Sequence, residues 1–219
     1  MDSTHRSARP IGWPGDDTAC VDHYFSPEPT GPQAQRTIGF RIGDQDYTLQ
    51  TAGGVFSADR LDPGTAVLLR KAVLPGPDTS GPLLDLGCGY GPIACVLATR
   101  APAAVVWAVD VNARARELTA TNAAALGLGE RVRVVEPDGV PPEVEFTQIW
   151  SNPPVRVGKQ ELHRLLSRWL PRLAPGGVAW LVVARHLGGD SLQAWLVQQG
   201  WHAERYASQK GYRVLRVRR

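Results

Sequence analysis

From residue 81 onward, short apolar runs alternate with segments of helical periodicity, and this alternation restricts the possible folds more than any other feature of the chain. The apolar runs are nearly continuous, which is typical of parallel strands buried on both faces. The predicted strands are residues 83–86, 105–109, 132–135, 146–151 and 178–183, and the predicted helices are residues 92–100, 112–126, 160–173 and 191–199. A closing hairpin, residues 201–206 and 212–217, turns at Lys210-Gly211. The pattern predicts an α/β fold with a mostly parallel sheet between two layers of helices.

The first 80 residues follow a different pattern. Residues 1–20 are polar and contain Gly and Pro without an apolar period, which predicts a flexible tail. Residues 36–51 alternate between apolar and polar side chains around Gly43-Asp44, which predicts a β-hairpin, and residues 65–73 have helical spacing. We therefore expect three parts: a tail over residues 1–20, an extension with hairpin and helix over residues 21–80, and an α/β domain over residues 81–219.

Composition excludes several classes of protein. The chain has 219 residues, a net charge of +3 and 43% apolar residues, which is ordinary for a globular protein. Its longest apolar runs are about seven residues, whereas a membrane helix needs about 20, and no apolar signal core follows Met1. Three cysteines (Cys20, Cys88 and Cys95) fit a reducing cytoplasm better than a disulfide scaffold, and no Cys/His cluster has zinc spacing. We expect a cytoplasmic protein without a membrane span or a metal site.

The densest signal is a glycine-rich loop, residues 85–92 (Asp-Leu-Gly-Cys-Gly-Tyr-Gly-Pro), between the first predicted strand and helix. In an open parallel sheet the ligand lies beside this loop, and glycines allow positive φ angles and a close approach of the backbone. A dinucleotide fingerprint requires Gly or Ala where this chain has Pro92, and proline lacks an N–H for a pyrophosphate. The loop therefore favours a nucleoside without phosphates, such as S-adenosylmethionine, over a nicotinamide dinucleotide. A plain tight turn is the alternative.

Acidic residues follow the next two predicted strands. Asp110 ends the second strand, 25 residues after Asp85, where a carboxylate can accept hydrogen bonds from both ribose hydroxyls. Asp138 follows the third strand, where a side-chain acceptor could meet the adenine amino group. Each residue has a structural alternative: Asp110 could cap the following helix, and Pro137-Asp138-Gly139 is also a good turn sequence.

A second motif, Ser151-Asn152-Pro153-Pro154, directly follows the fourth predicted strand and so lies at the same sheet edge as the glycine loop. The two prolines stiffen the backbone and remove two N–H donors, leaving the Asn152 side-chain oxygen and nearby carbonyls as fixed acceptors. Two acceptors that hold both hydrogens of an exocyclic amine favour a pyramidal nitrogen, whose lone pair can attack a methyl carbon. The sequence thus predicts Asn152, Pro153 and Pro154 as a catalytic element that acts by positioning and preorganisation. The alternative is that these residues only make the backbone rigid where the chain leaves the strand, without a catalytic role.

Together these motifs resemble class I S-adenosylmethionine-dependent methyltransferases, and more narrowly the "methyltransferase small" group, which contains small-subunit ribosomal RNA guanine-N2 methyltransferases. The resemblance covers roughly residues 23–219. It is carried by Asp85 to Gly91, Asp110-Val111-Asn112, Ser151 to Pro154, Gly54-Val55-Phe56-Ser57, Leu61-Asp62-Pro63-Gly64-Thr65 and Gly158-Lys159. It implies a Rossmann-like seven-stranded sheet with an antiparallel last strand, S-adenosylmethionine as methyl donor and a guanine amino group as acceptor.

The resemblance also implies roles for individual residues. The expected cofactor contacts are Asp85 (near the methionine ammonium), Gly87, Cys88, Gly89, Gly91, Asp110, Val111, Asp138 and Asn152, and the expected substrate contacts are Phe56, Val155, Arg156 and Lys159. Many members are twice this length, with a degenerate N-terminal copy of the domain. The residue after Asn-Pro-Pro is often an aromatic that stacks on the target base, but here it is Val155. Stacking would then come from Phe56, Tyr24, Phe25 or Arg156.

Basic residues could hold a nucleic-acid backbone, and the last ten residues contain five of them and no acid. The candidates are Arg156, Lys159, Arg185, Lys210, Arg213, Arg216, Arg218 and Arg219. We therefore expect N-methylation of an exocyclic amine of an RNA base, guanine-N2 of 16S ribosomal RNA, with ribosomal RNA or the small subunit as partner. Two alternatives stay open: an N-methyltransferase of a protein glutamine or a small-molecule amine, and a weakly catalytic module that binds S-adenosylmethionine and RNA during ribosome assembly.

Overall fold

The computed structural model describes residues 35–55, 57, 59–154 and 158–219. Several predictions concern residues outside these ranges. They are the flexible tail and the roles of Tyr24, Phe25, Phe56, Val155 and Arg156.

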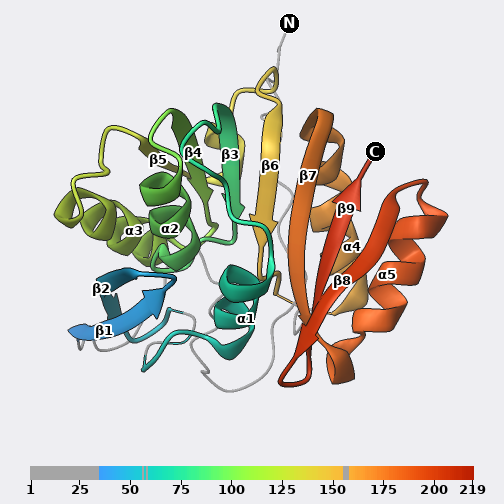
Figure 1. Cartoon of the computed structure of the whole chain (residues 1–219), viewed down its shortest axis with the longest axis horizontal. Helices are drawn as coiled ribbons and strands as arrows, with labels where there is room; N and C mark the ends of the chain where they lie inside the picture. Colours follow the sequence, from blue (N-terminus) through green and yellow to red (C-terminus); the bar gives the residue numbers. More distant parts are fainter. Residues whose placement is uncertain (1–34, 56, 58, 155–157) are drawn as a thin grey trace, which may run out of the picture.

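Seven strands form one sheet in the order β5-β4-β3-β6-β7-β9-β8 (Figure 1). Their bounds are Gly81–Leu86 (β3), Ala104–Val109 (β4), Val132–Val135 (β5), Phe146–Ser151 (β6), Leu173–Ala184 (β7), His202–Gln209 (β8) and Tyr212–Arg218 (β9). Strands β3 to β7 pair in parallel, whereas β9 pairs antiparallel with both β7 and β8. The predicted Rossmann-like sheet with a reversed last strand is confirmed. Its strand order changes direction between β3 and β6, which is where such sheets bind ligands.

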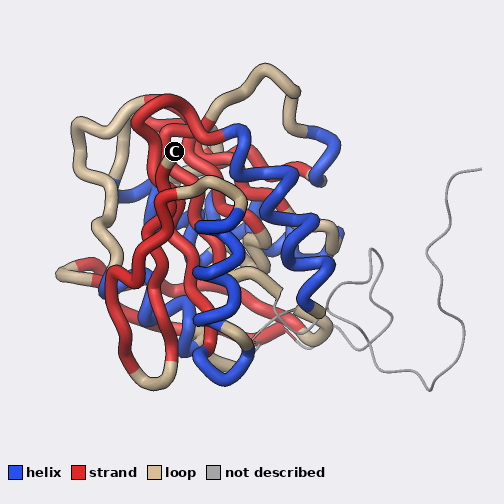
Figure 2. Tube along the Cα trace, turned by 90° about the vertical axis from the view of Figure 1, so that its right-hand side faces the viewer, coloured by secondary structure: helices blue, strands red, loops and turns tan. Residues whose placement is uncertain are grey.

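Helices cover both faces of the sheet (Figure 2). One face carries α1 (Pro63–Lys71), α2 (Pro92–Arg100) and α3 (Ala113–Ala125), and the other carries α4 (Lys159–Trp169) and α5 (Gly189–Gln198). Neighbouring residues of a strand point into different cores: Leu83 packs with the α1–α3 core and Leu84 with the α4–α5 core. None of the helices in the described ranges is long and apolar enough to cross a membrane.

The predicted hairpin is confirmed as β1 (Gln35–Ile42) and β2 (Gln45–Ala52), which pair antiparallel around a turn at Gly43. Buried hairpin side chains, among them Tyr47 and Leu49, join the same apolar core as α2 and α3. Buried Asn122 of α3 also binds both backbone groups of Gln50, accepting from its N–H at 2.7 Å and donating to its carbonyl at 2.8 Å. The hairpin of the N-terminal extension therefore packs against the α/β domain through both apolar and polar contacts.

The predicted end of the helix after β6 was wrong. Helix α4 ends at Trp169 and a 3₁₀ turn over Leu170–Arg172 leads directly into β7, which contains Pro175-Gly176-Gly177. Pro171 is the physical reason, because it lacks the N–H that would continue the helical hydrogen bonds. Gly176, at φ +75°, instead lies in an irregular stretch of β7, where the pairing with β6 shifts register.

Candidate functional site

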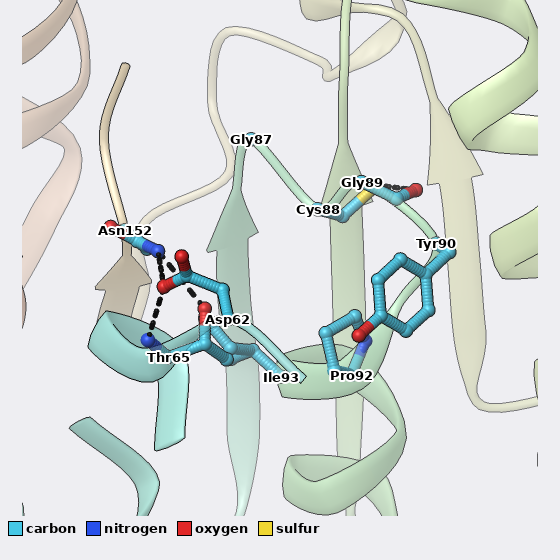
Figure 3. Close-up of a pocket in the computed structure, with 9 residues that line it drawn as sticks. All are labelled: Asp62, Thr65, Gly87, Cys88, Gly89, Tyr90, Pro92, Ile93 and Asn152. Atoms are coloured by element: carbon cyan, nitrogen blue, oxygen red, sulfur yellow. Dashed lines mark hydrogen bonds between the residues drawn. The ribbon is translucent and has the colours of Figure 1, made fainter. Parts of the chain in front are cut away.

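The carboxyl ends of β3 and β6 are joined by one side-chain hydrogen bond. Ser151, fully buried, donates from Oγ to the Leu86 carbonyl oxygen at 2.7 Å. Because Leu86 precedes Gly87 and Ser151 precedes Asn152, this bond brings the beginnings of the two predicted motifs together (Figure 3).

The glycine loop has a backbone that only glycine adopts easily. Gly87, Gly89 and Gly91 all have positive φ angles (+77°, +58° and +90°), and Gly91 is the N-cap of α2. Thr119 of α3 donates to the Gly89 carbonyl at 2.8 Å, and a Cβ on Gly91 would lie 3.0 Å from Thr119. A Cβ on Gly87, by contrast, would meet no atom within 4 Å. The loop is thus packed tightly on its α3 side and open at Gly87.

Asp110 holds this loop in place. Its Oδ2 accepts from the Gly89 N–H and its Oδ1 from the Asn112 N–H, each at 2.9 Å. The alternative role as a helix cap was wrong, because Asn112 caps α3 by accepting from the Ala115 N–H at 3.0 Å. Each carboxylate oxygen has a second lone pair, so the predicted contact with ribose hydroxyls is compatible with these bonds. Val111, the next residue, is exposed.

Asp85 is a fully buried carboxyl with one unused oxygen. Its Oδ2 accepts from the Ala94 N–H at 2.8 Å, whereas Oδ1 has no hydrogen-bond partner in the described part of the chain. Burial raises the pKa of Asp85 to about 8, the Ala94 hydrogen bond opposes this rise, and the nearby charge of Asp110 adds to it. An orphaned buried acceptor of this kind fits the predicted neighbourhood of a ligand ammonium group.

The raised pKa of Asp85 predicts how stability depends on pH. The folded protein keeps this proton up to about pH 8, whereas the unfolded chain loses it near the ordinary pKa of 3.8. The folded state therefore binds more protons in this window, and the contribution of Asp85 to the free energy of unfolding falls as pH rises, by about 2 kcal/mol between pH 6 and pH 8. Urea unfolding at several pH values should show this slope in the wild type and not in Asp85→Asn. Identical slopes for the two proteins would contradict it.

Asn152 is held by two residues of the segment that starts α1. Its Nδ2 donates to Asp62 Oδ2 at 2.7 Å and to Thr65 Oγ1 at 3.0 Å, and Asp62 Oδ2 also accepts from the Thr65 N–H at 2.8 Å as the N-cap of α1 (Figure 3). A carboxylate accepts but cannot donate, so the amide nitrogen of Asn152 must face Asp62. Its Oδ1 then points away from Asp62, and no described residue donates to it.

Gly64 allows this arrangement by its size. A Cβ on Gly64 would lie only 2.9 Å from Cε1 of the Tyr212 ring and 2.9 Å from Asp62 Oδ2. A larger residue would push α1 away from β9 or displace the carboxylate that holds Asn152. The absence of a side chain at Gly64 therefore lets α1 lie close to the sheet edge (Figure 1).

A narrow pocket lies where the glycine loop, the start of α1 and Asn152 meet. Its lining residues are Asp62, Thr65, Gly87, Cys88, Gly89, Tyr90, Pro92, Ile93 and Asn152. The enclosed volume is only about 20 Å³, much smaller than a typical small-molecule site, and the space beside Gly87 is open. Burial raises the pKa of the Cys88 thiol, so this residue stays protonated and acts as a small packing group.

The structure brings some of the predicted site residues together at the pocket and places others away from it. Gly87, Cys88, Gly89 and Asn152 line the pocket together, and Gly91, Asp85 and Asp110 fix the surrounding backbone. Pro153 is buried and Pro154 half-buried directly after Asn152. Asp138 and Lys159 do not line the pocket. The Asp138 side chain is 87% exposed and accepts from Arg168 at 2.7 Å, and Lys159 is exposed at the start of α4.

Five residues that line the pocket were not predicted as functional: Asp62, Thr65, Tyr90, Pro92 and Ile93. Asp62 and Thr65 were noted only as part of the family resemblance, although Asp-Pro at the start of a helical segment is a capping pattern. That pattern predicts the N-cap of α1. It gives no sign that the same carboxylate also binds a side chain 90 positions away.

The absence of an acid from the last ten residues suggested that this basic cluster lacks a counter-charge, and this was wrong for three of its five members. Arg216 and Arg218 form ion pairs with Glu204 of β8, and Arg213 pairs with Asp190 of α5. The acids come from neighbouring elements, so they are invisible in a count over the last ten residues. Among the described residues, no group of His, Cys, Asp and Glu side chains could hold a metal ion.

Comparisons with known proteins agree with this fold. The family model "Methyltransferase small domain" matches residues 46–216. The chain is 30% identical over 201 residues to "Uncharacterized protein YbxB" of Bacillus subtilis, covering 90% of this chain and 98% of that protein. It is 40% identical over 163 residues to "Ribosomal RNA small subunit methyltransferase C" of Pseudomonas aeruginosa, covering 67% of this chain and 47% of that protein. It therefore spans about half the length of that relative.

Among solved structures, the fold is similar to that of a T. thermophilus 16S rRNA N2 methyltransferase in complex with AdoMet and guanosine. The TM-score is 0.71 at 26% identity, and the match covers 86% of this chain and 51% of that one. A ribosomal protein L11 methylase of Lactobacillus delbrueckii matches with a TM-score of 0.59 at 18% identity, which shows a shared fold alone.

Proposed function

Because this chain belongs to the methyltransferase small domain family and uses S-adenosylmethionine as methyl donor, we propose that it methylates an exocyclic amine of an RNA base, namely guanine-N2 of 16S ribosomal RNA. The orientation of Asn152 carries the proposal, since its amide is held with Oδ1 free to accept. Further support comes from the relative named for small-subunit ribosomal RNA and from the structure solved with guanosine.

The residues of the chain act by positioning the amine. Asn152 Oδ1 accepts one hydrogen of the amino group, and a backbone carbonyl of the Asn-Pro-Pro segment accepts the other. Two such bonds draw the nitrogen lone pair out of conjugation with the base and direct it at the methyl carbon. Asp62 and Thr65 keep the amide from rotating, so the acceptor is in place before the substrate arrives.

When bound, S-adenosylmethionine would supply an electrophilic methyl group, and the electron pair of the broken carbon–sulfur bond would stay on sulfur as a neutral thioether. The amine nitrogen forms the new bond to carbon and releases one of its protons to solvent. The open face at Gly87 and the Asp110 carboxylate would hold the nucleoside, and the unused Asp85 oxygen would face the ammonium group. In this proposal residues 81–219 are the methyltransferase domain, the extension 21–80 supplies the wall that orients Asn152, and the protein works in the cytoplasm.

The proposal is tested with methyl-labelled S-adenosylmethionine and cells that lack the protein. Small ribosomal subunits, protein-free 16S RNA and a protein extract from those cells are incubated with the wild type and with Asn152→Ala. Mass spectrometry of nucleosides should find new N2-methylguanosine in the RNA with the wild type only. Label in a protein, in a small molecule or in another nucleoside would reject the assigned substrate.

A further inference from the structure

A second hollow lies at the same edge of the sheet, where the β8–β9 turn meets the end of β7. It measures about 310 Å³ and is lined by polar and basic residues, among them Arg185, Arg205, Lys210 and Tyr212. No acidic residue lines it. This basic cleft is separate from the pocket that contains Asn152.

Three of the four cationic side chains that line the cleft have no counter-charge among the described residues. The side chains of Arg185, Arg205 and Lys210 are exposed and form no ion pair or hydrogen bond with any residue that the structure describes. Arg213, the fourth cation of the cleft, pairs with Asp190, and Arg216, which does not line the cleft, pairs with Glu204. Three unpaired cations around one hollow attract an anion more strongly than the net charge of the chain implies.

The sheet fixes the backbone from which these cationic side chains extend. The Arg185 N–H donates to the Gly211 carbonyl at 2.8 Å, so the end of β7 is bonded to the hairpin turn. Tyr212 pairs with Ala184 in the antiparallel ladder. Lys210 and Gly211 both have positive φ angles (+50° and +78°), which gives a tight two-residue turn. The backbone of the cleft is thus built from paired strands and a tight turn.

The cleft also adjoins the Asn152 pocket. Tyr212 lines the cleft, and its ring contacts α1 at Gly64, which stands between Asp62 and Thr65. Those two residues hold the Asn152 amide. The hairpin turn and the start of α1 lie next to each other at the lower edge of the sheet (Figure 1). A chain that crosses Tyr212 therefore passes from the cleft to the reactive pocket.

We infer that the basic cleft binds phosphodiester groups of the RNA strand next to the target nucleotide; this rests on the function proposed above. A base that reacts at its Watson–Crick edge must leave the helix, so the enzyme needs a hold on the flanking backbone. Phosphate contacts supply affinity and register without reading sequence, and three unpaired cations on a well-ordered strand framework suit that task. Recognition of sequence must then come from other parts of the surface.

The test compares two double variants of one hairpin. Arg205→Gln with Lys210→Gln removes two charges from the cleft, and Arg216→Gln with Arg218→Gln removes two charges that are paired with Glu204 outside it. Affinity for a fragment of the methylated RNA is measured by fluorescence anisotropy at several salt concentrations. The cleft variant should bind the RNA about tenfold more weakly. Its plot of log K against log salt concentration should also be less steep by about 1.4, which is about 0.7 for each of two lost phosphate contacts. The paired variant should change either quantity much less.

The outcomes separate the two proposals. If the wild type methylates RNA and both double variants bind it equally well, the cleft inference is overturned while the proposed function stands. If the cleft variant loses activity only on assembled subunits and binds protein-free RNA normally, the cleft contacts a ribosomal protein and the inference is also overturned. Absence of RNA methylation by the wild type would overturn the proposed function itself. Affinity for S-adenosylmethionine, measured by calorimetry, should stay the same in all three proteins.

Discussion

Replacement of Asn152 by alanine is expected to lower kcat by about 10²- to 10³-fold, the range found when one preorganised hydrogen-bonding group is removed from a reacting centre. The Asn152 Oδ1 would act on the amine and not on the cofactor, so the Kd for S-adenosylmethionine should change by less than about twofold. Single-turnover methyl transfer and calorimetry measure the two quantities. A large loss of S-adenosylmethionine affinity with little further loss of rate would move Asn152 from catalysis to cofactor binding.

A second variant at this position gives a signature that a structural defect would not produce. Asn152→Asp places a carboxylate beside Asp62, because the amide nitrogen it replaces lies 2.7 Å from Asp62 Oδ2. Two adjacent carboxylates repel, and one of them retains a proton to an unusually high pH. At low pH that proton restores the bond to Asp62 and leaves the other oxygen as the acceptor. Activity of Asn152→Asp should therefore rise as pH falls, relative to the wild type at each pH.

Substitutions of Thr65, which holds the Asn152 amide, should lower kcat to different extents. Thr65→Val keeps the shape of the buried side chain but removes the oxygen that accepts from Asn152 at 3.0 Å. We expect kcat to fall by about tenfold, equivalent to ~1.4 kcal/mol, with KM little changed. Thr65→Ser retains the hydroxyl and should restore most of the rate. If Thr65→Ser and Thr65→Val are equally impaired, the hydroxyl has no positioning role.

The parts of the site that sequence reasoning located are those where local geometry and function require the same residues. Gly87 and Gly91 have positive φ angles in a loop between a strand and a helix. Glycine is the residue that adopts such angles without strain, so the residue type alone indicates this backbone conformation. Asn152 follows a buried strand, which fixes its place at the sheet edge, and the two prolines after it have no backbone N–H to donate.

The parts that sequence reasoning did not locate depend on contacts between distant segments. The bond from Asn152 to Asp62 joins residues 90 positions apart, and the ion pairs of Arg213 and Arg216 depend on which strand and helix lie beside β9. The order and register in which the strands pair decide these contacts, and neither can be recognised from the residues of one local segment. The misplaced helix end has a different cause: both Pro171 and Pro175-Gly176 can stop a helix, and the nearer proline acts first.

The open face of the glycine loop provides the second large effect. Gly87→Ala forces an L residue to φ +77°, which should cost about 1–2 kcal/mol of stability, and it adds a methyl group that meets no protein atom within 4 Å. Gly176→Ala is a matched control, because Gly176 has φ +75° and equally open surroundings but lies in β7 outside the pocket. Both variants should lose similar free energy of unfolding in urea.

Only Gly87→Ala should bind S-adenosylmethionine more weakly. If the nucleoside lies along the open side of Gly87, the added methyl group occupies that space, and the Kd for S-adenosylmethionine should rise by at least about tenfold in Gly87→Ala and stay unchanged in Gly176→Ala. Calorimetry on both proteins decides the matter. Equal affinities would mean that the Gly87 face is not the cofactor surface, and the cofactor would then have to bind elsewhere along the loop between β3 and α2. A tenfold difference at equal stability assigns the open face to the cofactor, since backbone strain is the same in both variants.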